Sequence, residues 1–369
     1  MPPKKICIRS EVGSTSIKSF NIDEDVVEKI FTYLPVKFVG RIGARLKRFH
    51  YSWKFSQYLD FDKDFAECMT QKDYVNTVVC IMMSHQGSKV CRFRLYSDAN
   101  LDYDLLHNWL DILNKKEAEE IDLDFSPGKK ETFVFYGNLI DSETPFKILK
   151  LTHCKLKLPF NEMTCWSNLT CITLRRVLLD NNLSIIVSAN CYVLEKLILI
   201  QCRGIGMLII NAPDHKRLKM LTVARCFEIH EMVIVVPTLT TFHYRGYTRN
   251  VGLSIDSASM LHDVVLDLIS PKIYPCILRF EMDLSHVKTL TVSSHFIEAL
   301  KRQPIIIPNV KEVQILMEER SYCNLYDIAD FLISCPLLER VFLDINGFFF
   351  NDGPYWQRHD SQHFKNFSA

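Results

Sequence analysis

The chain has 369 residues, of which 48% are hydrophobic and 24% are charged, a composition typical of folded soluble proteins rather than of disordered or fibrous ones. Its 44 basic and 43 acidic residues leave a formal net charge of +1, so no global positive field favours generic binding to nucleic acid or to a membrane surface. The N-terminal stretch lacks the apolar run of a secretory signal, and no later run approaches the length of a membrane helix. We therefore expect a protein of the cytosol, the nucleus or both.

The first predicted element is a helix over residues 22–37, with Asp23 as its N-cap and with Pro35 ending it. Its apolar residues share one broad face: Val26, Val27, Ile30, Phe31 and Leu34. Two further amphipathic stretches, at 36–46 and 46–59, complete a predicted three-helix unit. A unit this small is marginal on its own, so we expect its apolar surface to serve an interface.

A repeated pattern occupies most of the remaining chain. The clearest copies fit an apolar-x-x-apolar-x-apolar template closed by a small or apolar residue: FKILKLTHC (146–154), NLTCITLRRV (168–177), VLEKLILIQC (193–202) and RLKMLTVARC (217–226). The middle apolar residue of each copy serves as an index, and the full series is Phe93, Ile121, Leu149, Ile172, Leu197, Leu221, Phe242, Val264, Leu290, Val313 and Val341. Successive index residues are 21 to 28 positions apart, which is the period of leucine-rich repeats.

The template has the two-residue period of a β-strand. This period directs Leu149 and Leu151 to the interior and leaves Lys150 and Thr152 on the opposite, solvent-facing side. No single repeat can bury its apolar face, so neighbouring strands must stack side by side. The pattern predicts an α/β leucine-rich-repeat solenoid with a curved parallel sheet.

The segments between these strands predict what closes each repeat. LSIIVSANC (183–191), MLIINAPDH (207–215) and MVIVVPTL (232–239) alternate apolar residues before a break, which predicts a return strand or turn with short or absent helices. In contrast, the segment 325–345 has helical spacing up to Pro336 and a strand after it.

The 13 cysteines and the dispersed histidines predict no metal site and no cofactor. No C-x-x-C pair occurs, so structural zinc of the usual spacing is not expected. Cys154, Cys202 and Cys226 recur at one repeat position, which favours packing over chemistry. An enzyme with a catalytic cysteine would instead require an exposed, reactive thiol beside a histidine.

The N-terminal block also matches a known motif. The matching residues, in order and spacing, are Asp25, Val26, Val27, Ile30, Leu34, Pro35, Lys47, Arg48, Trp53, Leu59, Asp60, Phe61 and Asp62. The chain resembles plant F-box proteins with leucine-rich repeats, and SCPLLERVFLDI resembles the start of their FBD-type segment. Ile22 and Asp23 stand where that family has Leu-Pro, Leu46 replaces a serine, and Phe49 replaces the first tryptophan.

The resemblance implies a non-enzymatic substrate-recognition subunit of an SCF-type cullin-RING ubiquitin ligase. It implies a flexible stretch at 1–19, an F-box module at 20–62, repeats at 75–320 and an FBD-like segment at 321–369. The module would dock a Skp-type adaptor and, through it, a cullin. The implied adaptor contacts are Ile22, Val26, Val27, Ile30, Phe31, Leu34, Pro35, Val36, Leu46 and Trp53.

The outward strand positions are candidates for binding a target protein, because solenoids usually bind through their concave face. The candidates are Lys150, Thr152, Thr173, Arg175, Ile198, Ile200, Thr222, His243 and Arg245, with Asp267 beside them. An alternative is a repeat scaffold that binds a partner without recruiting a ligase, as the residues at 23 and 49 would allow.

Overall fold

The computed structural model describes residues 24–67, 69–98, 100–126, 132–140, 143–158, 166–247, 252–256, 259–269, 279–300, 305–317, 323–344 and 365–367. The chain divides into two compact units. The first comprises residues 1–97 and 102–123, and the second comprises residues 98–101 and 124–369. Among the described helices, none is both long and apolar enough to cross a membrane.

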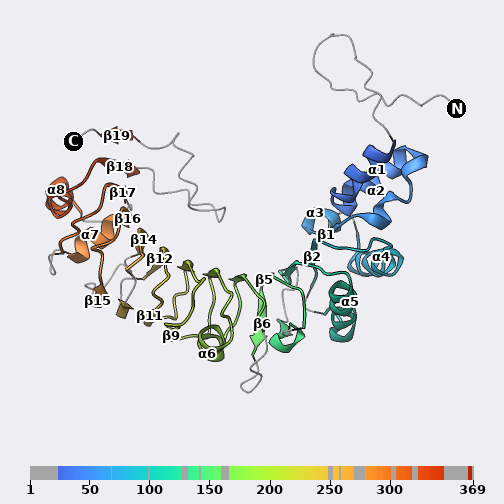
Figure 1. Cartoon of the computed structure of the whole chain (residues 1–369), viewed down its shortest axis with the longest axis horizontal. Coiled ribbons are helices and arrows are strands. Elements are labelled where there is room, and N and C mark those ends of the chain that lie inside the picture. The colour runs from blue at the N-terminus through green and yellow to red at the C-terminus, as the bar shows by residue number, and fades with distance from the viewer. Residues whose placement is uncertain are drawn as a thin grey trace, which may run out of the picture. The chain divides into compact units, whose positions relative to one another are not determined.

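The first unit begins with two α-helices (Figure 1), α1 (Glu24–Thr32) and α2 (Val36–Arg45). The first helix ends three residues before Pro35, earlier than predicted, because a residue that precedes proline disfavours the helical conformation. The expected third helix is absent from the described residues 46–59, which form two 3₁₀ turns, η1 (Lys47–Phe49) and η2 (Ser52–Phe55). Ile22 and Asp23 lie outside the described residues.

The remainder of the first unit already has a strand-and-helix architecture. Its elements are β1 (Tyr58–Phe61), α3 (Lys63–Ala66), α4 (Gln71–Ser84), β2 (Arg92–Tyr96), α5 (Tyr103–Lys115) and β3 (Glu120–Asp124). The strands follow one another in the order β1, β2, β3, with β1 parallel to β2. Residues 59–61 of the acidic run therefore belong to the first strand of the sheet, which the motif did not indicate.

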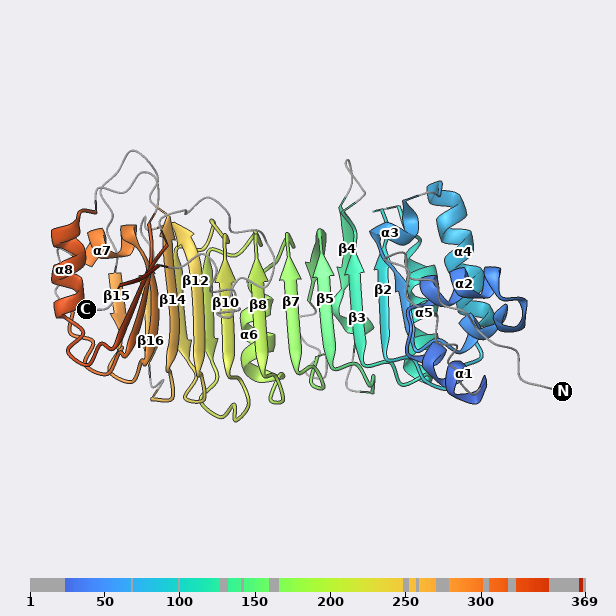
Figure 2. The same ribbon diagram turned by 90° about the horizontal axis from the view of Figure 1, so that it is seen from above.

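The second unit contains the predicted parallel sheet, whose strands lie side by side in Figure 2. Its parallel strands are β5 (Ile148–Thr152), β7 (Cys171–Arg175), β8 (Lys196–Ile200), β10 (Met220–Ala224), β12 (Thr241–Tyr247), β14 (Asp263–Ile269), β16 (Thr289–Ser293), β17 (Glu312–Leu316) and β18 (Arg340–Asp344). A short strand, β19 (Lys365–Phe367), pairs with β18 in the antiparallel sense.

The index residues from Leu149 to Val341 are direct register partners from strand to strand. All of them are buried. This confirms the predicted leucine-rich-repeat solenoid, since the apolar side chains of successive repeats form one shared core.

Return strands form a second layer in the second unit. The strands β9 (Met207–Asn211), β11 (Glu231–Val235), β13 (Gly252–Asp256) and β15 (Arg279–Met282) pair in parallel. They confirm the return strands predicted at 207–215 and 232–239. A shorter parallel pair, β4 (Phe133–Tyr136) and β6 (Cys154–Lys157), flanks the 3₁₀ turn η3 (Gly137–Leu139).

One return segment is a helix instead of the predicted strand or turn. Residues 183–191 fall largely in α6 (Asn182–Ala189), where Leu183, Ile186 and Val187 are buried at helical spacing. Three-residue and four-residue intervals bring these side chains to one helix face, whereas strand geometry would place Ile186 and Val187 on opposite faces. The C-terminal prediction is confirmed, because α8 (Leu325–Ile333) ends before Pro336 and precedes β18; α7 (Ser294–Leu300) was not predicted.

The central strands end in a repeated left-handed turn. His153, Arg176, Gln201 and Arg225 have φ values of 58°, 53°, 54° and 55°. Each of their backbone N–H groups donates to the carbonyl oxygen of a residue in the next repeat. The residue after each turn is buried, and these residues are Cys154, Val177, Cys202 and Cys226. The three cysteines are therefore packing residues of the turn, as their repeated position predicted.

Candidate functional site

The N-terminal helices build their own small core. Val27, Phe31, Val39 and Phe49 are buried together, and Leu34, Ile42 and Trp53 pack against them. The rings of Phe31 and Phe49 meet edge to face, with centroids 4.9 Å apart and an interplanar angle of 85°. Edge-to-face packing of this kind is a favoured aromatic geometry. These buried side chains hold the module together and are not available to a partner.

The outer face of α1 remains apolar and exposed. Val26, Ile30 and Tyr33 are 49%, 46% and 56% exposed. They lie at positions i, i+4 and i+7, so they share one face of the helix. Exposed apolar residues that gather on one face often mark an interaction site. We call these three residues the α1 stripe.

The ten predicted adaptor contacts therefore divide into separate groups. Val26, Ile30 and Leu46 are exposed, whereas Leu34, Pro35 and Trp53 are partly buried. Val27, Phe31 and Val36 are buried, so their assignment as contact residues is corrected to core residues. Ile22 lies outside the described residues.

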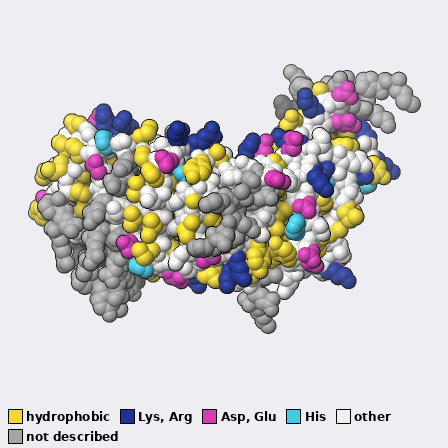
Figure 3. Space-filling view, turned by 60° about the horizontal axis from the view of Figure 1, so that its bottom comes forward, with side chains coloured by type: hydrophobic (Ala, Val, Ile, Leu, Met, Phe, Trp, Pro, Cys, Tyr) yellow, Lys and Arg dark blue, Asp and Glu magenta, His cyan; other side chains and the backbone are white. Residues whose placement is uncertain are grey.

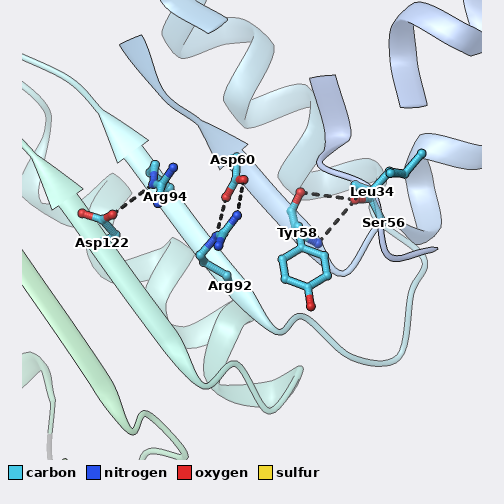
Figure 4. A network of polar contacts seen from close by, with 7 residues as sticks. All are labelled: Leu34, Ser56, Tyr58, Asp60, Arg92, Arg94 and Asp122. Atoms are coloured by element: carbon cyan, nitrogen blue, oxygen red, sulfur yellow. Dashed lines mark hydrogen bonds and ion pairs between the residues drawn. The ribbon is translucent and has the colours of Figure 1, made fainter. Parts of the chain in front are cut away.

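The helical module is joined to the first strand by a set of polar contacts (Figure 4). The Ser56 hydroxyl donates to the Leu34 carbonyl at 2.6 Å. The Gln57 N–H donates to the Thr32 carbonyl at 2.7 Å. His85 directly follows α4, and one of its ring nitrogens forms a hydrogen bond with the Ser56 carbonyl at 2.9 Å. These contacts fix the orientation of the module relative to β1 within the first unit.

The outward face of the first strands carries a ladder of ion pairs. Arg92 contacts both Asp60 oxygens, with Nε–Oδ1 at 2.9 Å and Nη2–Oδ2 at 2.6 Å. Arg94 Nε lies 3.0 Å from Asp122 Oδ2 on β3. Hydrogen bonding to Asp60 raises the pKa of Arg92. The acidic run of the N-terminal motif thus has a structural role, since Asp60 links β1 to β2 and Asp62 caps α3.

In the second unit, the predicted target-binding residues meet in two rows across the sheet. The first row follows register partners through Lys150, Thr173, Ile198, Thr222 and His243. The second row contains Thr152, Arg175, Ile200, Ala224, Arg245 and Asp267. Neighbouring members of a row are separated by the strand spacing, roughly 4.8 Å. Residues far apart in the sequence therefore share one continuous surface of the sheet.

Burial changes the interpretation of one end of these rows. Thr222, His243, Arg245 and Asp267 are 6%, 3%, 9% and 0% exposed, which corrects the expectation that they face solvent. Arg245 Nε lies 3.1 Å from Asp267 Oδ2, so the two buried side chains form an ion pair. The partly exposed candidates are confined to β5, β7 and β8: Lys150, Thr152, Thr173, Arg175, Ile198 and Ile200.

The sequence profile of one family matches residues 81–366. Its description is "At1g61320/AtMIF1, LRR domain". The chain belongs to this leucine-rich-repeat family. The FBD-associated F-box protein At1g61320 of Arabidopsis thaliana is 29% identical over 394 residues, covering 100% of this chain and 83% of that protein. A second Arabidopsis protein, At1g61330, named provisionally as an FBD-associated F-box protein, is 28% identical over 377 residues and covers 97% and 83%.

These similarities confirm the resemblance to plant F-box proteins with leucine-rich repeats and an FBD segment. A more distant relative, the Arabidopsis F-box protein At4g09920, is 24% identical over 286 residues, covering 74% of this chain and 86% of that protein. In this F-box/leucine-rich-repeat protein, the helical module precedes the repeats along the chain.

The cysteines at the turns of this F-box/leucine-rich-repeat protein are buried. Burial raises the pKa of the Cys154 thiol, which disfavours the thiolate needed for nucleophilic attack. Cys202 and Cys226 are buried at the equivalent position of two later repeats. No group of three or more histidine, cysteine or acidic side chains suited to a metal ion occurs in the described part of the chain.

Several relevant residues and elements were not predicted from the sequence. Tyr33 belongs to the α1 stripe, and its i+7 spacing from Val26 was a usable signal. The helices α4 and α5 were missed, although Thr70 and Asp102 cap them and both have buried residues at helical spacing. In this F-box/leucine-rich-repeat protein, both helices belong to the first unit.

Proposed function

We propose that this chain is the substrate-recognition subunit of an SCF-type cullin-RING ubiquitin ligase. In this proposal the helical module docks a Skp-type adaptor, and through it a cullin, while the repeats hold a target protein in the cytosol or nucleus. The chain performs no chemistry itself. The names of the Arabidopsis relatives, which are F-box proteins, support the assignment.

The observation that carries the proposal is the α1 stripe. The module already has a complete core of Val27, Phe31, Val39 and Phe49, so the exposed Val26, Ile30 and Tyr33 are not needed for its internal packing. An apolar helix face of this kind suits a protein interface, which buries apolar and aromatic side chains at its centre. Phe49, one of the departures from the family motif, lies in the core and leaves this face unchanged.

The test is a charge placed on the α1 stripe. We expect Ile30→Glu to abolish the complex with a purified Skp-type adaptor in size-exclusion chromatography, because a carboxylate cannot be buried in an apolar interface without a large desolvation penalty. The matched control is Ile185→Glu on α6, since Ile185 is 50% exposed and Ile30 is 46% exposed. Equal melting temperatures for both variants would show that the fold is intact.

Two outcomes would contradict the proposal. A complex retained by Ile30→Glu would mean that the stripe is not the docking surface. Failure of the unsubstituted chain to bind the adaptor would favour the alternative, a repeat scaffold without ligase recruitment.

A further inference from the structure

A groove runs across the turns that follow the central strands, at the edge where the arrowheads of β5, β7, β8 and β10 end (Figure 2). Its volume is about 630 Å³. The floor includes the buried Cys154, Val177 and Cys202, which come from three successive repeats. The groove therefore lies within the second unit and crosses several repeats, so a ligand would lie perpendicular to the strands.

The two walls of the groove are equivalent rows of the repeat. One row contains the left-handed residues His153, Arg176, Gln201 and Arg225, each directly before a floor position. The other row follows the floor positions and contains Leu178, Arg203 and Phe227. Backbone bridges link Lys155 to Leu178 and Leu178 to Arg203. At a strand spacing of roughly 4.8 Å, four repeats span about 14 Å, or four to five residues of an extended peptide.

The charged residues that line the groove are mainly cationic. Among the described residues that line the groove, Arg176, Arg203 and Arg225 are arginines, and the carboxylate is that of Glu228. Glu228 Oε2 accepts a hydrogen bond from the Gly204 N–H at 2.6 Å, which directs that carboxylate to the backbone. Gln201 Oε1 accepts a hydrogen bond from Arg176 Nε at 2.9 Å and so orients the guanidinium. Guanidinium groups pair well with carboxylates through two parallel hydrogen bonds.

The groove also offers apolar contact. Leu178 and Phe227 are 40% and 46% exposed, and the Phe227 ring stacks on that of Tyr247 with centroids 4.3 Å apart. An extended peptide projects successive side chains in opposite directions, so it can present acidic and apolar side chains to both rows of the groove. A protein segment therefore matches this mixture of charge and apolar surface.

Nucleic acid matches the surface less well. Specific nucleic-acid interfaces are large and strongly positive, whereas this groove spans four repeats of a chain with a net charge of +1. Basic and acidic side chains are interspersed on the face of the molecule shown in Figure 3. The positive charge of the groove comes from three arginines, which suits a short peptide ligand.

We propose that this groove binds an extended acidic peptide segment, with Arg176, Arg203 and Arg225 pairing its aspartate or glutamate side chains. This proposal rests on the proposed function, because the peptide segment is taken to belong to a target protein of the ligase. The binding itself needs no adaptor.

The test uses the full chain without adaptor and a fluorescein-labelled pool of octapeptides with glutamate at alternate positions. A second pool with glutamine at those positions controls for charge. In fluorescence anisotropy at low ionic strength, we expect the glutamate pool to bind at least about tenfold more tightly, because charge-assisted hydrogen bonds are stronger than neutral ones. Added salt should weaken this binding.

Three substitutions and one control assign the binding to the groove. Arg176→Gln, Arg203→Gln and Arg225→Gln should each weaken binding of the glutamate pool about fivefold to tenfold, and the triple variant should abolish it. Glutamine already occupies the left-handed turn at Gln201, so this residue type suits the backbone. Arg217→Gln is the control, because Arg217 is exposed in the same repeat as Arg225 but precedes the strand, at the opposite edge.

The outcomes separate this proposal from the ligase assignment. Equal binding of the two pools, or full binding by the triple variant, would overturn the acidic-peptide site whether or not the adaptor binds. Binding of a phosphoserine pool or of single-stranded RNA without binding of the glutamate pool would also overturn it. Loss of adaptor binding in Ile30→Glu would leave the peptide measurements unchanged.

Discussion

Arg245 and Asp267 form a buried ion pair between β12 and β14, with 3.1 Å between Nε and Oδ2 and side-chain exposures of 10% and 0%. At that separation, with an effective dielectric constant of about 20, Coulomb's law gives an attraction of roughly 5 kcal/mol. Desolvation opposes this attraction by several kcal/mol for each ion. We therefore expect the intact pair to add little net stability, whereas one buried charge without the other is strongly destabilising.

The perturbation is a double-mutant cycle with Arg245→Met and Asp267→Leu. Each single substitution should lower the free energy of unfolding by about 3–5 kcal/mol, because it removes the opposite charge from a buried ion pair. The double variant should recover most of that loss, since both charges are then gone. Urea unfolding followed by far-ultraviolet circular dichroism measures these free energies, and hydrogen exchange of the β12 and β14 amides would localise the effect.

An exposed pair provides the control. Lys311 Nζ lies 2.6 Å from Glu339 Oε1, closer than the buried pair, but the side chains are 54% and 56% exposed. Solvent screens this pair, so Glu339→Gln should leave the urea midpoint unchanged within error. If the losses from Arg245→Met and Asp267→Leu simply added in the double variant, the claim that burial couples these two charges would be wrong.

Two further predictions concern a turn and a histidine. Gly204 has a φ of +85°, and a Cβ there would lie 2.2 Å from the Leu179 carbonyl oxygen. Gly204→Ala should therefore lower the melting temperature. The control is Gly40→Ala, which should preserve or raise the melting temperature, because Gly40 lies in a helix and no atom is within 4 Å of the added Cβ. Burial lowers the pKa of His85. Below a pH of about 6.5, His85 therefore binds a proton more readily in the unfolded chain than in the folded chain, so the stability of the fold decreases on acidification. His85→Gln, which keeps a donor for the Ser56 carbonyl, should reduce the steepness of that fall in chemical unfolding measured from pH 7 to pH 5; an unchanged slope would exclude His85 as a contributor.

Local patterns predicted a large part of the fold. The two-residue alternation and the repeat period identified the interior residues from Leu149 to Val341, and these are register partners in the sheet. The helical spacing before Pro336 likewise predicted α8. The strand alternation and the helical spacing follow from the backbone geometry of a single element, so one sequence is enough to reveal them.

The candidate site depended more on contacts between elements. The apolar residues of α1 read as one broad face, but neighbouring helices bury Val27 and Phe31 and leave Val26 and Ile30 exposed. Among the outward positions, Ile198 stays partly exposed whereas the equivalent His243 is buried. The spacing of the residues along the chain does not predict which of these side chains are buried and which are exposed.

The sequence by itself determined the repeat architecture and the family motif, because strand alternation, repeat length and motif order are all read along the chain. Only the tertiary structure decided which polar residues are buried and which form a common surface. The arginine groove illustrates the reason, since Arg176, Arg203 and Arg225 belong to three repeats and become neighbours only when the turns stack. Burial and proximity are set by the packing of distant segments, which a local pattern does not specify.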